Sequence, residues 1–325
     1  MKRSYLQYLF LLFNIYIGVR FYLFVRYFET GGATPFFSRP PSVEAYLPIA
    51  SLIGFKHLLV NKVFDPVHPA ALVILLAATL SAIVLRRGFC SWICPIGTVS
   101  ELTYKLGGKV AVNLKPHRFV DIPLRSLKYL LLGFFVSAVV GMNAATLQGF
   151  IDSPYNRIAD VKMLLHFRNP STTTLTVLGS FFLLSLVVKN FWCRYLCPYG
   201  ALLGLLSKLG LVGVERDAKR CIDCGKCEES CPSNIDITKR KKVTSAECIM
   251  CAECVNACSE TKALAIKSLK PKNSIKPREY GLALVGLFLA VILIAQATGH
   301  WQTNISPAEY RQSIPAAVEP VYGRP

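Results

Sequence analysis

The stretch that decides the fold runs from Cys221 to Cys258 and contains two cysteine runs of one pattern. The first reads Cys221-Ile-Asp-Cys224-Gly-Lys-Cys227-Glu-Glu-Ser-Cys231-Pro232, and the second reads Cys248-Ile-Met-Cys251-Ala-Glu-Cys254-Val-Asn-Ala-Cys258. Each run is C-x2-C-x2-C-x3-C, a spacing that binds [4Fe–4S] clusters. The sequence therefore predicts two such clusters here.

The predicted ligand sets exchange their fourth cysteine, because the last cysteine of such a run binds the other cluster. Cluster I is assigned Cys221, Cys224, Cys227 and Cys258, and cluster II is assigned Cys248, Cys251, Cys254 and Cys231. Zinc is the alternative, but its four ligands commonly form two separated C-x2-C pairs. Ser259 follows the second run where Pro232 follows the first, which loosens one turn and leaves the ligands intact.

The composition is that of a membrane protein. Of 325 residues, 53% are hydrophobic and the mean hydropathy is +0.41, too apolar for an ordinary soluble chain. The net charge of +18 comes from basic residues that flank apolar segments, so it indicates membrane orientation rather than nucleic-acid binding. All 12 cysteines fall in metal-type or paired motifs, which indicates a reducing compartment.

Hydropathy predicts about five membrane spans, since crossing a bilayer takes roughly 20 apolar residues. The expected spans are 1–30, 67–86, 127–142, 175–188 and 280–297. The first begins as a signal peptide would, but no small-residue cleavage site follows it. Between the spans we expect an interfacial or re-entrant helix at 46–60, an amphipathic surface segment at 96–120 and a polar loop at 143–172. We expect a disordered or partner-binding tail after the last span.

An internal repeat surrounds the remaining four cysteines. The segment Phe89-Cys90-Ser-Trp-Ile-Cys94-Pro95-Ile-Gly97 aligns without a gap with Trp192-Cys193-Arg-Tyr-Leu-Cys197-Pro198-Tyr-Gly200. Further along, Lys105-Leu106-Gly107 matches Lys208-Leu209-Gly210. Two predicted spans separate the copies, so both motifs face one side of the membrane, as in a parallel duplication.

Each C-x3-C-P motif places two thiols one helical turn apart, on one face of a helix. Two such pairs facing each other provide four thiols, Cys90, Cys94, Cys193 and Cys197, as a possible third redox site. Three alternatives stay open for it: a third iron–sulfur cluster, a dithiol/disulfide pair, or thiols that only pack.

The predicted topology puts every cysteine in the cytoplasm. With the N-terminus inside and five spans, both repeats and the ferredoxin-like segment lie on the side where basic residues crowd. The run Lys239-Arg240-Lys241-Lys242 is then a solvated loop or a docking edge for an acidic redox partner. The expected divisions are a duplicated membrane domain at 1–214, a small α+β two-cluster ferredoxin-like domain at 215–270, and a last span with a periplasmic tail at 271–325.

These motifs together resemble the membrane polyferredoxins of the NapH type, the membrane subunits of quinol dehydrogenases. A loop reading Arg39-Pro40-Pro41-Ser-Val-Glu44-Ala-Tyr46-Leu-Pro48 is also similar to this group, and the resemblance covers about residues 1–275. It implies electron transfer between the quinone pool and a partner reductase, cytochrome or ferredoxin-like subunit in the bacterial inner membrane.

Other functions receive less support from the residues. No histidine lies in mid-span or pairs with another, which argues against a b-type haem; His57, His68 and His166 are expected to make interfacial hydrogen bonds. No hydrolytic triad, phosphate loop or dinucleotide fingerprint occurs. An assembly factor that reduces a metal or disulfide of another protein, and a thiol-based redox sensor, are the alternatives to a respiratory subunit.

Overall fold

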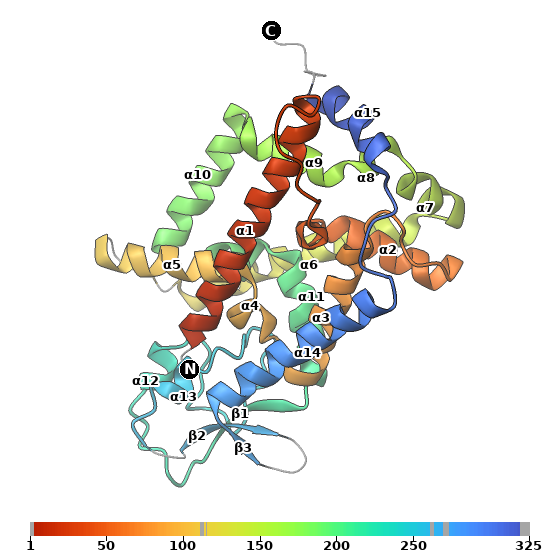
Figure 1. Ribbon diagram of the computed structural model, residues 1–325. Coiled ribbons are helices and arrows are strands. Elements are labelled where there is room, and N and C mark those ends of the chain that lie inside the picture. The colour runs from red at the N-terminus through yellow and green to blue at the C-terminus, as the bar shows by residue number, and fades with distance from the viewer. Residues whose placement is uncertain (1–2, 111–113, 115, 261–262, 269–272, 319–325) are drawn as a thin grey trace. The chain divides into compact units, whose positions relative to one another are not determined.

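The computed structural model describes residues 3–110, 114, 116–260, 263–268 and 273–318 (Figure 1). The chain forms two compact units that interleave along the sequence. Unit 1 comprises residues 1–11, 77–133 and 178–290, and unit 2 comprises 12–76, 134–177 and 291–325. All 12 cysteines belong to unit 1. The three-part division expected from composition stays a prediction.

The described chain is mainly helical, as expected. Its longer helices are α1 (Arg3–Glu29), α2 (Pro48–Asn61), α3 (Pro69–Leu85), α5 (Pro95–Val110), α6 (Arg118–Gly141), α7 (Ala144–Ile151), α9 (Ala159–Arg168), α10 (Thr172–Val187), α11 (Pro198–Leu206), α14 (Pro277–Ala297) and α15 (Pro307–Val318). Its short helices are η1 (Pro41–Tyr46), α4 (Phe89–Trp92), α8 (Pro154–Arg157), η2 (Trp192–Leu196), η3 (Ser207–Leu209), α12 (Lys226–Glu229) and α13 (Glu253–Asn256). The helix α2 matches the short helix expected at 46–60.

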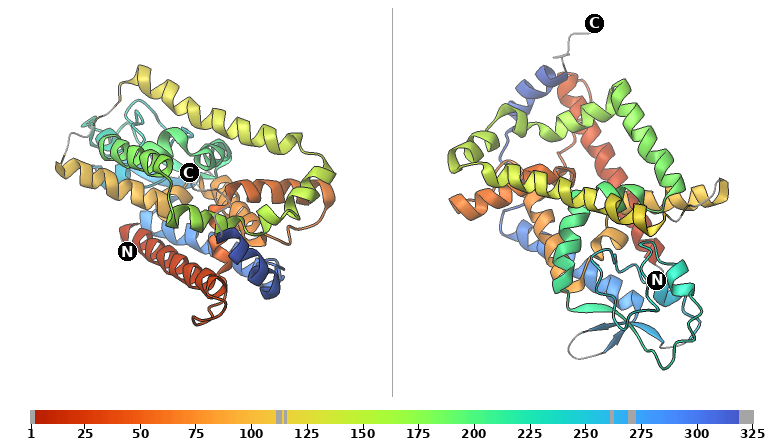
Figure 2. Two further views of the ribbon diagram at one scale, coloured as in Figure 1. Left: turned by 90° about the horizontal axis from the view of Figure 1, so that it is seen from above. Right: turned by 180° about the vertical axis from the view of Figure 1, so that it is seen from behind.

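A small antiparallel sheet in unit 1 brackets the two cysteine runs. Strand β1 (Val212–Arg216) pairs with β2 (Leu264–Ser268), with Val214 opposite Ile266, and β2 pairs with β3 (Ser274–Ile275). Val214 and Ile266 are buried, whereas Glu215 and Lys267, which follow them, are half-buried. The short helices α12 and α13 lie beside this sheet (Figure 2). The segment is the α+β ferredoxin-like part that the sequence predicts.

Unit 2 has an apolar core built around the second half of α1. Phe21, Phe24 and Phe28 are buried there at helical spacing, because residues three and four apart share one helix face. Phe24 packs edge-on against Tyr310 of α15, with ring centroids 5.2 Å apart. The core also takes Leu147 and Ile151 from α7 and further residues from η1, α2 and α9.

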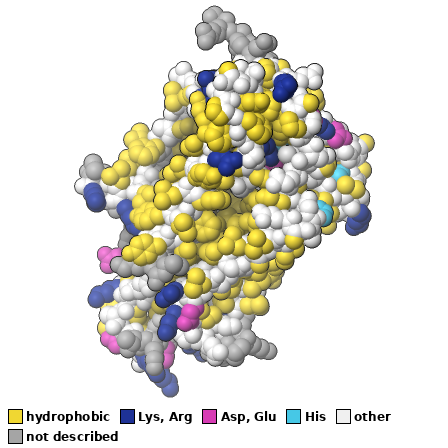
Figure 3. Space-filling model, viewed as in Figure 1, with side chains coloured by type: hydrophobic (Ala, Val, Ile, Leu, Met, Phe, Trp, Pro, Cys, Tyr) yellow, Lys and Arg dark blue, Asp and Glu magenta, His cyan; other side chains and the backbone are white. Residues whose placement is uncertain are grey.

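In the part of the chain that the structure describes, three helices are long and apolar enough to cross a membrane: α1, α6 and α14. The helices α9 and α10 pass the same test only as a pair bent by 81°, and α3 is apolar but has 17 residues. The five spans expected are therefore not confirmed by length and composition alone. Exposed apolar side chains such as Leu9, Phe13 and Leu293 lie on these helices, and hydrophobic atoms cover much of the face in Figure 3.

The expectation of a polar loop at 143–172 is wrong, because three helices occupy most of it. The side chain of Asn143 accepts a hydrogen bond from the Thr146 amide and caps α7, and Ser153 caps α8 in the same way. Asp160 and Val161 of α9 are buried. Pro154 and Asp160 indicated a loop, whereas here they lie in the first turns of α8 and α9.

The expectation of a disordered tail is wrong for residues 307–318, which form α15. Its turns bury Tyr310 and Ile314, which are four residues apart and therefore on one face. The internal Pro315 follows the first two turns and did not prevent the helix. Residues 319–325 of the expected tail lie outside the described residues.

Candidate functional site

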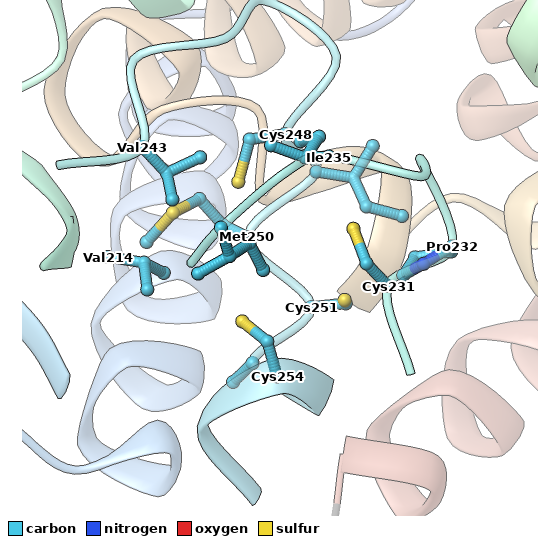
Figure 4. A pocket seen from close by; sticks show the side chains of 12 residues that line it. Val214, Cys231, Pro232, Ile235, Val243, Cys248, Met250, Cys251 and Cys254 are labelled. Atoms are coloured by element: carbon cyan, nitrogen blue, oxygen red, sulfur yellow. The ribbon is translucent and has the colours of Figure 1, made fainter. Parts of the chain in front are cut away.

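The four cysteines assigned to cluster II line one pocket. Cys231, Cys248, Cys251 and Cys254 surround it together with apolar side chains, including Ile235, Val243 and Met250. Their side chains turn toward the same space (Figure 4). Three of the four are buried and Cys248 is half-buried. Burial raises the pKa of the Cys251 thiol to about 12. A shielded set of four thiols with an apolar lining fits an iron–sulfur cluster.

The two cysteine runs share one backbone conformation, position by position. Asp223 and Met250, each just before the second cysteine, have positive φ angles of 51° and 49°. Gly225 and Ala252, each just after that cysteine, have φ angles of 74° and 62°. Short helices α12 and α13 then begin at matching positions. Left-handed residues coil a loop tightly, and in the second run Cys248, Cys251 and Cys254 line one pocket.

The cysteines assigned to cluster I are more exposed. Cys224 is exposed, and Cys221, Cys227 and Cys258 are half-buried. The Cys224 Sγ lies 3.8 Å from the Ser259 hydroxyl, so the residue after the second run reaches the loop of the first run. The backbone amide of Lys226 and the Ser259 hydroxyl lower the pKa of the Cys224 thiol. The two sets of thiols therefore differ in access to solvent, although their loops match.

Among the described residues, no group of three or more His, Cys, Asp or Glu side chains has the arrangement that holds a single metal ion. The ligand assignment itself stays a prediction.

The C-x3-C-P motifs do not lie on continuous helices, which corrects the expected geometry. Cys90 belongs to α4, but Cys94 follows its end, and Cys197 follows the π-helical turn η2 that contains Cys193. In each copy the amide of the second cysteine donates over five residues, from Cys94 to the Phe89 carbonyl and from Cys197 to the Trp192 carbonyl, both at 3.0 Å. Proline after each second cysteine begins a new helix, since its missing N–H is not needed there.

The four thiols nevertheless lie close enough to interact electrostatically. Burial raises the pKa of the Cys193 thiol well above its ordinary value, and Cys197, Cys94 and Cys90 raise it further. Burial and the neighbouring Cys90 raise the pKa of Cys94 to about 12. All four are half-buried. The structure thus brings together the four cysteines that the repeat singled out.

The two copies of the repeat hold each other through reciprocal contacts. The Leu211 amide, beyond the second motif, donates to the Val84 carbonyl before the first motif, and the Leu114 amide donates to the Val187 carbonyl, both at 3.0 Å. Val84 and Val187 occupy the same position relative to the two motifs. The two acceptors are therefore equivalent in the two copies, although the two donors are not.

The first motif is bonded directly to the loop that carries the cluster II cysteines. Trp92, 2% exposed, donates its indole N–H to the Met250 carbonyl at 3.0 Å, and the Ser91 hydroxyl donates to the Ile249 carbonyl. Ile249 and Met250 lie between Cys248 and Cys251. The guanidinium of Arg3 binds Glu101 and Glu253, both at 2.8 Å, beside the same loop. The four-thiol site and the loop of the cluster II cysteines are therefore held together by direct hydrogen bonds.

Two arginines that sequence reasoning treated only as orientation signals add to these contacts. Arg86 donates to the carbonyls of Val243 and Ser245. The Arg87 Nε lies 3.5 Å from the Cys90 Sγ, and its Nη1 lies 3.9 Å from a Glu247 carboxylate oxygen. The position of these arginines just before Cys90 could have indicated a role at the site. Basic residues at the end of a membrane span are, however, already explained by the positive-inside rule.

Comparison with protein families agrees with these sites. A family described as "4Fe-4S binding domain" matches residues 67–113 and 171–214, once around each C-x3-C-P motif. A family described as "4Fe-4S dicluster domain" matches residues 213–259. With the cysteine arrangement above, these matches define the chain as an iron–sulfur protein of the ferredoxin type.

Curated relatives narrow this class. The chain is 41% identical over 96% of its length to the "Putative electron transport protein YccM" of Escherichia coli, covering 89% of that protein. It is 30% identical over 56% of its length to the E. coli "Ferredoxin-type protein NapH", covering 62% of it. It is 30% identical over 57% of its length to the Paracoccus denitrificans "Methylamine utilization ferredoxin-type protein MauN", covering 62% of that protein. The chain belongs to the NapH-type polyferredoxin family. No solved structure matches it.

Proposed function

We propose that this protein passes electrons between the membrane quinone pool and a partner redox protein through three cysteine-bound sites in sequence. The observation that carries the proposal is the pair of hydrogen bonds from Ser91 and Trp92 to the cluster II loop. Because these residues lie between Cys90 and Cys94, the four-thiol site and cluster II are connected through a few covalent and hydrogen bonds. A path this short would let an electron pass directly between the two sites, without a carrier that diffuses from one to the other.

Two [4Fe–4S] clusters form the outer part of this relay. Cys231, Cys248, Cys251 and Cys254 would hold cluster II, and the common pocket in Figure 4 supports that set. Cys221, Cys224, Cys227 and Cys258 would hold cluster I, and the contact between Cys224 and Ser259 supports the exchange of fourth ligands. A bound cluster supplies a one-electron centre. The chain contributes thiolates, an apolar shell around cluster II and a more exposed shell around cluster I.

The four-thiol site would be the third station, and an iron–sulfur cluster suits it better than a disulfide pair. All four thiols cluster beside Arg87, whose positive charge would offset part of the negative charge of four thiolates. The double match to one 4Fe-4S family supports the same reading, and so do the reciprocal Val84 and Val187 contacts expected of a pseudo-two-fold duplication.

The membrane placement we propose is multi-pass in the bacterial inner membrane, with the ferredoxin-like segment in the cytoplasm. The three apolar helices long enough to span a bilayer and the family relationship support a membrane protein. Reducing conditions suit clusters and free thiols alike. The alternative roles, an assembly factor for another metalloprotein and a thiol sensor, find no specific support among the described contacts.

The test is a titration of the purified full-length protein with a reduced quinol analogue, followed by low-temperature electron paramagnetic resonance. Cluster signals should appear on quinol addition, in proportion to the quinol oxidised. Iron should approach 12 atoms per chain for three clusters and eight for two. Cys94→Ala and Cys197→Ala should each remove the same third of the iron, whereas Cys224→Ala should remove a different third. Clusters that stay oxidised with excess quinol would contradict the quinone link.

A further inference from the structure

The loop of cluster I forms an exposed apolar tip. Ile222, between Cys221 and Cys224, is 62% exposed, and Cys224 beside it is exposed as well. In the cluster II loop, by contrast, Met250 and Cys251 are buried. Since electron exchange between proteins requires a close approach of the two redox centres, cluster I is the one that a second protein can reach. The two loops have the same backbone conformation, so their different exposure to solvent comes from the residues that pack around each loop.

Basic side chains surround this tip. The exposed cations of the segment are Lys219, Arg220, Lys226, Lys239, Arg240 and Lys241. Arg216 joins the turn that carries Lys239–Lys241 to the cluster I loop, because its guanidinium bonds the Arg240 carbonyl at 3.4 Å and the Asp223 carboxylate at 3.3 Å. The cations and the tip therefore belong to one continuous surface, which we name the basic edge.

The cations of the basic edge are largely free of internal partners. Among the described residues, Lys219, Lys226, Lys239, Arg240 and Lys241 form no ion pair. Nearby acids are engaged instead, since Asp217 pairs with Arg220 at 3.5 Å, Asp223 pairs with Arg216, and Glu228 accepts from Thr238. Glu229 and Glu260 remain as exposed carboxylates, so the surface keeps a net positive charge. Unpaired charges around an apolar centre are arranged like the rim and core of a transient interface.

We propose that the basic edge around Ile222 and Cys224 is the docking surface for an acidic, soluble one-electron carrier protein. This rests on the proposed electron-transfer function and names the partner of the cluster I end. The exchange moves one electron between cluster I and the carrier's own redox centre and transfers no atom or proton. Complementary charge speeds the encounter and orients the carrier, while contact with Ile222 excludes water at the point of closest approach.

The test uses the full-length protein in lipid nanodiscs and an acidic [2Fe–2S] ferredoxin as the probe, with the dissociation constant as the readout. At low ionic strength the double variant Lys239→Glu/Lys241→Glu should bind about tenfold more weakly than wild type, because electrostatic steering changes association rates by about 10–10³-fold. Added salt should remove most of that difference. The matched control is Lys276→Glu/Arg311→Glu, which reverses two exposed charges outside the basic edge and should bind like wild type.

Two further arms separate the alternatives. Ile222→Ala should weaken binding several-fold, whereas Leu209→Ala, an equally exposed apolar truncation, should not. Equal effects of both charge-reversal pairs, or equal binding of a basic cytochrome c, would overturn the proposal. Preferential binding of the detergent-solubilised protein to phosphatidylglycerol vesicles, without ferredoxin binding, would show that the edge meets lipid instead. Quinol reduction of the clusters without carrier should be the same in wild type and in both charge-reversal variants, so failure of that reaction in wild type refutes the relay and not the docking surface.

Discussion

Arg87 is a buried cation that lies beside the four-thiol site and beside Glu247, the residue that precedes the cluster II cysteines. It is 2% exposed, its Nε approaches the Cys90 Sγ, and its Nη1 faces Glu247. Gly200, just beyond the second motif, makes room for it, because a Cβ there would collide with the Arg87 guanidinium. A charge in such a position acts with little screening by water. Arg87 should therefore set the redox potential of the four-thiol site.

Replacing Arg87 with Gln should shift the midpoint potential of the four-thiol site to more negative values. Removal of a positive charge destabilises the more negative, reduced state, whether that state is a reduced cluster or a dithiolate. A tenfold change in the redox equilibrium corresponds to a shift on the order of 60 mV for a one-electron cluster, and to about 30 mV for a two-electron disulfide. Potentiometric titration with spectroscopic detection measures it.

Arg87→Lys keeps the charge and should restore most of the potential, which distinguishes an electrostatic role from a packing role. The potential of cluster I should not move in either variant, since its cysteines form none of the contacts made by Arg87. An unchanged potential of the four-thiol site in Arg87→Gln, with all iron retained, would contradict this assignment.

At the scale of elements, two glycines allow the repeats to cross closely. A Cβ on Gly107 of α5 would collide with the Leu186 carbonyl of α10, and a Cβ on Gly210 would collide with the Arg86 side chain. These glycines occupy matching positions of the two copies. Each therefore marks the place where one copy meets the other.

Gly107→Ala should lower thermal stability in detergent, by about 1–3 kcal/mol, because the added methyl group forces the backbone of α5 away from α10. Gly133→Ala and Gly179→Ala are matched controls, since nothing lies within 4 Å of a Cβ at either position. They should leave the melting temperature unchanged or raise it slightly, as Ala favours helix over Gly. Equal melting temperatures for Gly107→Ala and the controls would argue against the close crossing.

A buried ionic network fixes the loop before α2 to α9 and to the start of α3. Arg39 bonds Glu44 at 2.8 Å and Asp160 at 2.7 Å, and the second Glu44 oxygen accepts from the Ala71 amide. His68 Nε2 bonds the Asn156 carbonyl at 2.6 Å, and His68 Nδ1 faces Glu44 at 3.6 Å. Because Nε2 must donate to a carbonyl, protonation of His68 adds an Nδ1–H that points at Glu44.

Stability should therefore depend on pH through His68. Burial lowers the pKa of His68, but the hydrogen bond and charge of Glu44, with that of Asp160, outweigh burial and raise it above its unfolded value. The stabilisation is then complete below about pH 6.5 and is lost as pH rises through the folded pKa. His68→Gln should cost on the order of 1 kcal/mol more at about pH 5.5 than at pH 9. Thermal unfolding at both pH values measures this.

His57→Gln is the control for this prediction. His57 is also buried, but its ring nitrogens bond the Val63 carbonyl and the Gln148 side chain rather than a carboxylate. Its loss of stability at each pH gives the cost of removing a buried imidazole that has no carboxylate partner. A loss in His68→Gln that is the same at acid and alkaline pH would mean that the neutral ring contributes all of the stabilisation.

The sequence predicted those features that depend on the type of residue and on the spacing between residues. The ferredoxin runs, the short helix at 46–60 and the hydrogen-bonding roles of His57, His68 and His166 follow from residue type and position. The helices within 143–172 were missed because caps such as Asn143 and Ser153 are also typical of loops. The broken geometry of the C-x3-C-P motifs was missed because i, i+4 spacing takes no account of the proline after the second cysteine.

At the scale of the whole molecule, contacts within unit 1 restrict how often the chain crosses the membrane. Arg3, before the apolar part of α1, binds Glu101 and Glu253. If α1 crosses, a second crossing must return the chain before Glu101, and α3 is the apolar helix available. Likewise α6 lies between the two C-x3-C-P motifs, whose thiols lie together, so the bent pair α9–α10 must supply a return crossing.

We predict five spans, α1, α3, α6, α10 and α14, although only three helices of the described chain pass a test of length and composition. The 17 residues of α3 extend about 26 Å, slightly less than the roughly 30 Å of a bilayer core, a mismatch that local thinning accommodates. Because basic residues crowd beside both motifs, we predict that the shared side is the cytoplasm. Reporter fusions after Cys94 and after Ile266 should therefore both report cytoplasm, and fusions after Lys62 and after Asp152 should report periplasm. Opposite locations for the Cys94 and Ile266 fusions would be incompatible with the hydrogen bonds from Ser91 and Trp92 to the cluster II loop, and the relay order built on those bonds would have to be abandoned.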